Sequence, residues 1–382
     1  MVLTGIPNYP AGKVFPGYRF WKKRREDYHG IDVRRVPLIA RGSGRAWRLM
    51  LNYFSFVVFA CLLGPVMCRG KVDRILVYEP SPITVGLPAL LLKKLKRAPL
   101  FFWVQDLWPE SLSATGAIRA AWILKLVEYL VRFIYRGCDR ILVQSRAFCT
   151  PISNLGITSE RILYFPNSAE ELYQPVDIEP DAKERAEVPD GFRVMFAGNI
   201  GKAQDFDTIL AAAELLKEYQ DIHWVILGDG RMFDWVKDQV GERRLIDRVH
   251  LLGRHPVEKM PRYFALADVM LVTLRREAIF ALTIPAKVQS YLACSKPLIA
   301  ALDGEGANIV REAQAGLTPP AEDPRALADA VLTMYRMSDA ERREMGLRGR
   351  RYFEAHFERS MLLRRLDDWM KEAEGQVSLC AS

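Results

Sequence analysis

Short apolar runs recur along the chain, separated by segments in which apolar residues return with the period of a helix. The runs are continuous rather than alternating, which is typical of parallel strands covered by helices on both faces of a sheet. The segments 206–219 and 257–267 carry the helical spacing. Strand and helix alternate in two series, so the sequence predicts an α/β fold with two doubly wound domains. The predicted strands are 74–78, 100–104, 140–145 and 161–166 in the first series, and 193–198, 223–228, 248–253, 269–274 and 297–302 in the second.

The break between the two series lies in a segment rich in Pro, Asp and Glu at 166–191. We therefore predict an N-terminal domain over 1–168 and a C-terminal domain over 169–350. A charged helical tail follows, and the part from 351 to 382 is expected to cross back to the first domain. One side of this tail is apolar, with Leu362, Leu363, Leu366, Trp369 and Met370.

Composition narrows the possible partners. The 382 residues are about the number that two domains need, and half of them are hydrophobic, which excludes a disordered chain. The net charge of +8 suits an anionic substrate or an anionic membrane surface. No RNA-binding motif or recognition helix is evident, so nucleic acid is not an expected partner. The six cysteines and five histidines show no ligand spacing, so we expect no metal site.

Two segments raise the question of a membrane. Residues 49–68 carry no charge and reach the ~20 residues that span a bilayer, but a strand of the same domain follows directly. This favours a partly buried helix with one lipid-facing side over a true span. Residues 118–136 place Lys125, Glu128, Arg132 and Arg136 on one face, which fits a core helix or an interfacial helix equally. The other face carries Trp122, Ile123, Leu126, Val127, Leu130 and Ile134.

The stretch VMFAGNIGKAQDFDTIL, 194–210, runs from a strand into a helix through Gly198 and Gly201. One interpretation is a turn that needs positive φ; the other is an anion close to bare backbone at a helix N-terminus. The turn LGDGR at 227–231 has the same build. A third candidate, which involves no glycine, is Lys287. It lies in the first turn of a predicted helix, where the helix dipole disfavours a cation. A bound anion would offset the dipole; a solvated lysine is the alternative.

Another candidate site follows the strand 100–104. That strand delivers Gln105 and Asp106 to its carboxyl end, where ligands of doubly wound sheets bind. The alternative is that Asp106 only caps a helix that begins at Pro109.

Together the blocks FAGNIGKAQDFDTIL, VILGDGR, LLGRHPVEKMPRYFALADVMLV and TIPAKVQSYLACSKPLIAAL resemble the C-terminal half of family 4 retaining glycosyltransferases, which have two Rossmann-like domains facing a cleft (the GT-B fold). The block FFWVQDLWPESLSATG is similar to a bacterial subgroup that builds O-antigen, colanic acid and capsule. The resemblance covers nearly the whole chain.

The resemblance implies roles for individual residues. Gly198, Asn199 and Gly201 would face the diphosphate of a nucleotide sugar, UDP- or GDP-linked, with Lys202 and Lys287 neutralising it. Gly228 and Gly230 would lie near the base and ribose. Gln105 and Asp106 would face the sugar from the acceptor domain. The leaving phosphate would help to deprotonate the acceptor, which needs no enzymic nucleophile, and no Ser/His or paired-carboxylate constellation stands out in the sequence.

The chain departs from this pattern in three places. Gln105 stands where the family often has histidine. Leu282 and Ser290 stand where it often has two glutamates, so Ser290 or Gln289 would have to hold the ribose. Relatives also open with a strand and a glycine loop that precede the piece resembling VLTGIPNYP, so we expect the first domain to be incomplete at its N-terminus and its sheet to lack an internal strand.

The function that follows is transfer of a sugar, with retention and without a metal, from a nucleotide-diphosphate donor to a lipid-linked saccharide acceptor. The expected location is the cytoplasmic face of the inner membrane, as a peripheral protein, because the N-terminus lacks the build of a signal peptide. A nucleotide-sugar 2-epimerase and an inactive nucleotide-binding partner subunit are the alternatives.

Overall fold

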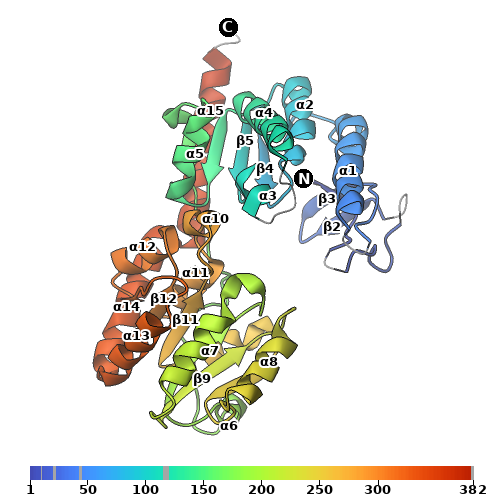
Figure 1. Ribbon diagram of the computed structural model, residues 1–382. Helices are drawn as coiled ribbons and strands as arrows, with labels where there is room; N and C mark the ends of the chain where they lie inside the picture. Colours follow the sequence, from blue (N-terminus) through green and yellow to red (C-terminus); the bar gives the residue numbers. More distant parts are fainter. Residues whose placement is uncertain (10, 20–22, 43–44, 115–119, 380–382) are drawn as a thin grey trace. The chain divides into compact units, whose positions relative to one another are not determined.

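The computed structural model describes residues 1–9, 11–19, 23–42, 45–114 and 120–379. The chain forms two compact units, which are Met1–Phe165 with Leu366–Ser382, and Pro166–Arg365 (Figure 1). The long helix α15, Arg359–Leu379, runs from the second unit into the first. The chain thus re-enters the first unit at Leu366, later than the expected 351, and within that unit Trp369 packs edge-on against Phe165.

The C-terminal unit contains one parallel sheet with the order β10-β9-β8-β11-β12-β13. The order reverses between β8 and β11, and in doubly wound folds ligands bind at the carboxyl ends of the strands beside this reversal. Five of the strands confirm the predicted ones, and the two-residue strand β13 was missed. Their bounds are β8 Phe192–Ala197, β9 Ile222–Leu227, β10 Val249–Gly253, β11 Val269–Thr273, β12 Leu298–Ala301 and β13 Gly316–Leu317.

Helices cover both faces of this sheet, which explains why its strands are continuously apolar. Alternate residues of β8 enter different cores: Met195 packs with α9, α11 and α12, whereas Val194 and Phe196 pack with α7, α8 and α13. The helices of the unit are α6 Lys183–Glu187, α7 Phe206–Leu215, α8 Phe233–Glu242, α9 Met260–Leu266, α10 Ala278–Leu282, α11 Ala286–Ala293, α12 Glu305–Glu312, α13 Pro324–Arg336 and α14 Asp339–His356.

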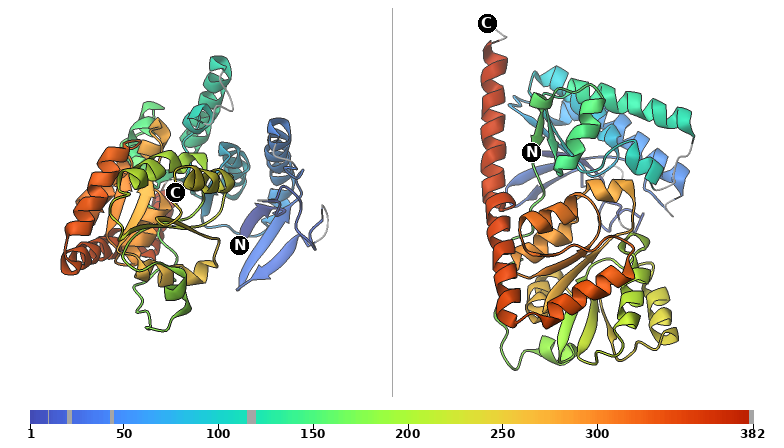
Figure 2. Two further views of the ribbon diagram at one scale, coloured as in Figure 1. Left: turned by 60° about the horizontal axis from the view of Figure 1, so that its bottom comes forward. Right: turned by 60° about the vertical axis from the view of Figure 1, so that its left-hand side comes forward.

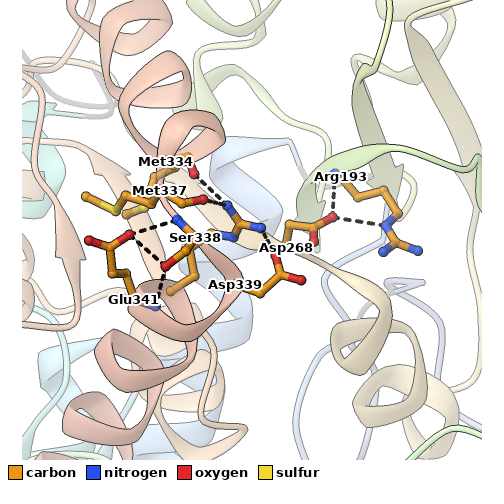
Figure 3. Close-up of polar contacts among 8 residues, drawn as sticks. Arg193, Asp268, Met334, Met337, Ser338, Asp339 and Glu341 are labelled. Atoms are coloured by element: carbon orange, nitrogen blue, oxygen red, sulfur yellow. Dashed lines mark hydrogen bonds and ion pairs between the residues drawn. The ribbon is translucent and has the colours of Figure 1, made fainter.

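Polar contacts fix the ends of several of these elements (Figure 3). The Ser338 hydroxyl accepts a hydrogen bond from the backbone N–H of Glu341, whose carboxylate accepts from the Ser338 N–H, so the two form a capping box at the start of α14. At the amino end of β8, the side chain of Asp268 accepts hydrogen bonds from the backbone N–H and the guanidinium of Arg193. The contacts between Arg193 and Asp268 tie the amino ends of β8 and β11 together, at the end of the sheet opposite to its carboxyl edge.

The N-terminal unit has a parallel sheet in the order β4-β5-β6-β7, and its four strands confirm the predicted ones. The inner strand β5 carries Leu100, Phe101 and Phe102, which are fully buried. The bounds are β4 Ile75–Glu79, β5 Leu100–Val104, β6 Arg140–Val143 and β7 Ile162–Tyr164.

A second, three-stranded sheet in the order β1-β3-β2 precedes it. Its strands are β1 Val2–Gly5, β2 Arg25–Tyr28 and β3 Ile31–Val36. The sequence analysis missed them because β2 and β3 are charged, with Arg25 and Arg34 both bonded to Asp32. The described strands of this unit therefore form two sheets, and the expectation of an absent internal strand stays a prediction.

Three long helices of the N-terminal unit lie in a row with α2 in the middle (Figures 1 and 2). Gly64 of α1 lies against Leu92 of α2, and Gly137 of α4 lies against Leu90 of the same helix. The helices of the unit are α1 Ala46–Met67, α2 Gly86–Lys96, α3 Glu110–Ala114, α4 Ala121–Gly137 and α5 Cys149–Asn154. The helix predicted at 118–136 corresponds to α4, and positions 118 and 119 lie outside the described residues.

Candidate functional site

A pocket of about 790 Å³ opens at the carboxyl end of β8 in the C-terminal unit, beside the point where the strand order reverses. We call it the Lys287 pocket. Its walls come from the end of β8, the N-terminal half of α11, the loop after β10, α9 and the segment that precedes α6. The lining residues are Glu170, Tyr173, Ala197, Gly198, Arg254, His255, Pro256, Val257, Glu258, Met260, Phe264, Ala286, Lys287, Ser290 and Tyr291.

The helix α11 is tied to the end of β8 by Tyr291. Its buried hydroxyl donates a hydrogen bond to the carbonyl of Ala197 and accepts one from the N–H of the same residue, both over 3.1 Å. Lys287 lies one turn earlier on α11, as the sequence predicts, and this anchor holds its side chain above the strand end. Strand and helix therefore position the lysine as one rigid element.

Lys287 is half-buried and lies over an aromatic ring. Its Nζ is 3.5 Å from the centre of the Phe196 ring, and no salt bridge to it is found among the described residues. Burial lowers the pKa of the Lys287 ammonium to about 7 from its usual 10.5. A buried cation at a helix N-terminus with no acidic partner is unfavourable alone, and a bound anion would relieve both the desolvation and the dipole.

The structure confirms the positive-φ interpretation for Gly198, and it adds close contacts that the sequence analysis did not foresee. A Cβ on Gly198, whose φ is +138°, would lie 2.6 Å from Cε of Lys287. A Cβ on Gly228, φ +141°, would lie 1.8 Å from the carbonyl oxygen of Gly198, and one on Gly230 would lie 2.2 Å from that of Ile200. These glycines let the lysine and two backbone loops approach one another. Contact with a diphosphate stays a prediction.

The other polar residues expected to bind the diphosphate, Asn199 and Lys202, do not line the Lys287 pocket. Asn199 and Lys202 are exposed. The N–H of Gly201 donates to the side-chain oxygen of Gln204 over 3.1 Å, so the turn is closed by its own side chains.

The two polar residues expected to replace a carboxylate on α11 differ in their surroundings. Gln289 is buried and its amide donates to the carbonyl of Asn167 over 2.7 Å, which places it outside the pocket lining. Ser290 lines the pocket, although its hydroxyl donates to the carbonyl of Ala286 over 3.2 Å. Of the two, only Ser290 is available to a ligand of the pocket.

The sequence analysis missed the charged residues that follow β10 and those that precede α6. Arg254 and Glu258 line the pocket from the loop after β10, and Glu170 lines it from the other side. Their position in the sequence could have identified Arg254 and Glu258. Both follow a predicted strand, β10, whose carboxyl end lies at the same edge of the sheet as that of β8.

In the N-terminal unit, the backbone after β5 is held to both neighbouring strands. The N–H of Gln105 donates to the carbonyl of Glu79 at the end of β4, and its carbonyl accepts from the side chain of Gln144 after β6. The side chain of Gln105 is mostly buried, and that of Asp106 is half-buried, where burial raises the pKa of its carboxyl. The carboxyl end of this sheet thus presents both of the predicted residues.

The structure also brings a second carboxyl group, that of Glu79, to this edge, which did not stand out in the sequence. Glu79 ends β4 and is fully buried, no side chain among the described residues bonds its carboxyl oxygens, and the backbone N–H groups of Gln105 and Asp106 lie near them. Burial, together with the charge of Asp106, raises the pKa of Glu79 to about 9, so it is protonated at neutral pH. The fully buried hydroxyl of Tyr135 is another donor in the same region, and it has no hydrogen-bond partner within the part of the chain that the structure describes.

Among the described residues, no group of three or more His, Cys, Asp and Glu side chains is placed to hold a metal ion. Transfer without a metal stays a prediction.

Two family profiles match the chain, one in each half. Residues 3–168 match the glycosyl transferase 4-like domain, and residues 191–337 match the glycosyl transferases group 1 domain. The chain is 32% identical over 259 residues to a Pseudomonas aeruginosa protein named "Probable glycosyltransferase WbjE", a region covering 64% of this chain and 63% of that protein. It is 24% identical over 300 residues, 76% of this chain and 72% of the other, to Escherichia coli WcaI, which is named for glycosyl transfer in colanic acid biosynthesis. The chain thus spans less than two thirds of WbjE.

Solved structures share the fold at low identity. Sucrose-phosphate synthase of Thermosynechococcus elongatus superposes with a TM-score of 0.71 at 17% identity, over 95% of this chain and 87% of that one. Anabaena HepE in complex with UDP superposes with a TM-score of 0.67 at 16% identity, over 85% and 84%. The two profiles together cover most of the chain and both describe glycosyl transferases: the chain consists of a glycosyl transferase 4-like domain followed by a glycosyl transferases group 1 domain, in the GT-B fold that these solved structures share.

Proposed function

We propose that this protein transfers a sugar, with retention, from a nucleotide-diphosphate donor to a lipid-linked saccharide in the synthesis of a bacterial surface polysaccharide. The observation that carries the proposal is the half-buried Lys287, held without an acidic partner among the described residues at the N-terminus of α11. The pocket around it is large enough for a nucleotide, at about 790 Å³. HepE, which has the same fold, was solved with UDP.

The pocket offers separate groups for the parts of such a donor. The ammonium of Lys287 and the N-terminus of α11 would neutralise the diphosphate, which becomes more negative as the bond to the sugar breaks. Ser290, one turn further along α11, offers a hydroxyl to the ribose or the sugar. Arg254 adds a second cation to the lining. Stabilisation of the leaving phosphate is then the main contribution of this unit to the reaction.

The acceptor belongs, in this proposal, to the carboxyl edge of the N-terminal sheet. Asp106 offers an acceptor of hydrogen bonds to a sugar hydroxyl, and Gln105 offers an amide. Protonated Glu79 next to Asp106 keeps this edge from carrying two full negative charges. A saccharide, which has many hydroxyls and little charge, is the chemistry that such an edge recognises.

The test is transfer by the full-length protein from a panel of UDP- and GDP-sugars to lipid-linked saccharides, read by mass spectrometry. Retention is read from the anomeric configuration of the product by NMR. We expect product only when donor and acceptor are both present, and the same rate with EDTA. A change of the donor sugar without acceptor would instead indicate an epimerase, and nucleotide binding without any turnover would indicate the inactive partner subunit.

A matched pair of lysine variants separates the site from general charge effects. Lys287→Ala should abolish most of the transfer. Lys237→Ala removes an exposed lysine from α8, outside the pocket lining, and should leave it unchanged. Equal activity of both variants would refute the assignment of the pocket.

A further inference from the structure

The helix α1 has its large apolar side chains on the outside. Its buried residues are small or polar, namely Asn52, Ser55, Ala60 and Gly64. Phe54, by contrast, is 67% exposed. Single exposed apolar residues are normal on a soluble protein, but a row of large ones along one helix marks a surface that binds something. The exposed row on α1 consists of Trp47, Met50, Leu51, Phe54, Leu62 and Val66.

The inner face of α1 is held to the N-terminal unit by specific contacts. The side chain of Asn52 donates to the carbonyl of Ile39 over 2.6 Å, and the N–H of Ile39 donates to the hydroxyl of Ser55 over 2.9 Å. Further along, Gly64 allows Leu3 of β1 to come within 3.2 Å of the position of a Cβ. Although α1 is long and apolar enough to cross a membrane, crossing would break these bonds and leave buried polar groups unpaired.

The helix α4 repeats the pattern on the far side of α2. Trp122, Leu126, Tyr129 and Phe133 recur every three or four residues and are all exposed, Trp122 by 71%. The sequence analysis left a core helix and an interfacial helix open for this segment, and the exposure of Trp122 and Leu126 favours the interfacial one. The core side of α4 carries Val131, Ile134 and Tyr135 instead.

Basic residues border these apolar rows. Residues 1–48 contain eleven Lys and Arg but only three Asp and Glu. Arg45 and Arg48 are exposed at the start of α1, and Arg69 lies exposed just after its end. Lys125 and Arg136 are exposed on α4 next to its apolar row. An apolar face within a basic border is complementary to a bilayer with anionic headgroups.

We propose that the exposed faces of α1 and α4 are a docking surface for an anionic lipid bilayer, in which α1 lies in the plane of the interface and does not span it. The proposal rests on observations independent of the Lys287 pocket. It deepens the proposed function, because a surface of this kind would bring the N-terminal unit to a lipid-linked acceptor.

The test uses the full-length protein and sedimentation with vesicles of phosphatidylcholine, with or without 30% phosphatidylglycerol. We expect binding to the anionic vesicles that is weakened by salt but not abolished, since the apolar part is not screened. Burial of one Phe or Met side chain is equivalent to about ten-fold or more in partitioning. Phe54→Ser and Met50→Ser should therefore each lower the vesicle partition coefficient about ten-fold.

Matched controls come from exposed apolar residues of the C-terminal unit. Ile246→Ser and Leu215→Ser remove similar exposed side chains and should leave vesicle binding unchanged. UDP affinity in solution should be equal in all four variants. If the donor assignment fails, the UDP titrations contradict it while vesicle binding is as expected. If this proposal fails, vesicle binding contradicts it while UDP binding is as expected.

Three outcomes would overturn the proposal. Vesicle binding that Phe54→Ser and Met50→Ser leave unchanged would remove α1 from the surface. Protein in cell membranes that resists carbonate and yields only to detergent would show that α1 spans. If sedimentation equilibrium without lipid shows a dimer that Phe54→Ser dissociates, and vesicles bind neither form, the occupant of this face is a second copy of the chain.

Discussion

Binding of a nucleoside diphosphate to the Lys287 pocket should take up nearly one proton at pH 8. The pKa of Lys287 is about 7 in the free protein because burial disfavours its charge. About one Lys287 in ten therefore carries its proton at pH 8 before binding. A diphosphate supplies the missing counter-charge and raises this pKa back toward the usual 10.5. The bound lysine is then almost fully protonated, and the difference is about 0.9 proton per ligand.

The same shift makes the affinity depend on pH. Only the protonated fraction of free Lys287 is ready to bind, and this fraction falls from about one half at pH 7 to about one hundredth at pH 9. The terminal phosphate is about nine-tenths ionised at pH 7 and almost fully ionised from pH 8, so its own titration changes the affinity little. We therefore expect binding to weaken about 50-fold from pH 7 to pH 9, which corresponds to about 2.3 kcal/mol.

The assay is calorimetric titration with UDP or GDP at pH 8 in two buffers of different ionisation enthalpy, from which the proton uptake follows directly. Lys287→Ala should abolish the uptake and weaken binding by about 1.5–3 kcal/mol at pH 7, while the bare nucleoside is unaffected. Lys202→Ala removes an exposed lysine and should leave the uptake intact. Tight binding without proton uptake at pH 8 would refute the assignment of Lys287 as the buried partner of the diphosphate.

Three further changes test other parts of the structure. Gly198→Ala should destabilise the fold by about 1–3 kcal/mol and weaken UDP binding, because the new methyl group meets Lys287 and the backbone φ is +138°. Gly30→Ala, also at positive φ but in open space, should cause only the loss of stability from backbone strain. An equal loss of UDP affinity in both variants would argue against the clash with Lys287. Because the pKa of Glu79 is raised to about 9, the free energy of unfolding should fall as pH rises from about 4.5 to 9. The difference in this free energy between Glu79→Gln and the wild type, measured by urea unfolding, should therefore shift in favour of the variant by up to about 2.7 kcal/mol between pH 6 and pH 8. A difference that stays constant with pH would refute the buried acid. Asp106→Asn should lower the transfer rate with UDP affinity unchanged, and a parallel loss of UDP affinity would contradict its place on the acceptor side.

The sequence by itself determined the order of the elements. Nine apolar runs predicted nine strands of the two parallel sheets, because a strand buried on both faces must be apolar throughout and this leaves a signal in any short window. The signal failed for β2 and β3, where charged side chains pair with one another in the sheet. The sequence also located Lys287 in the first turn of its helix, because the residues that mark the start of a helix lie next to it in the chain.

The surroundings of the candidate site were decided only by the tertiary structure. Nothing near Gly198 in the sequence shows that its missing Cβ makes room for Lys287, 89 positions away, because that contact exists only once α11 is tied to β8 through Tyr291. Glu79 likewise closes an ordinary apolar strand, and its pKa is raised only in the fold, first because the neighbouring elements bury it and second because the charge of Asp106 after β5 is near.

The segments that form α1 and α4 show the same division. The sequence shows the length and apolar composition of both segments. It does not show which face of α1 is buried, because both faces are apolar enough to pack in a core. Which face is buried depends on the neighbours: Asn52 and Ser55 find hydrogen-bond partners at Ile39, so the polar side turns inward and Phe54 is left outside. Burial is a property of a residue's partners across the fold, and the periodicity of a single helix does not contain it.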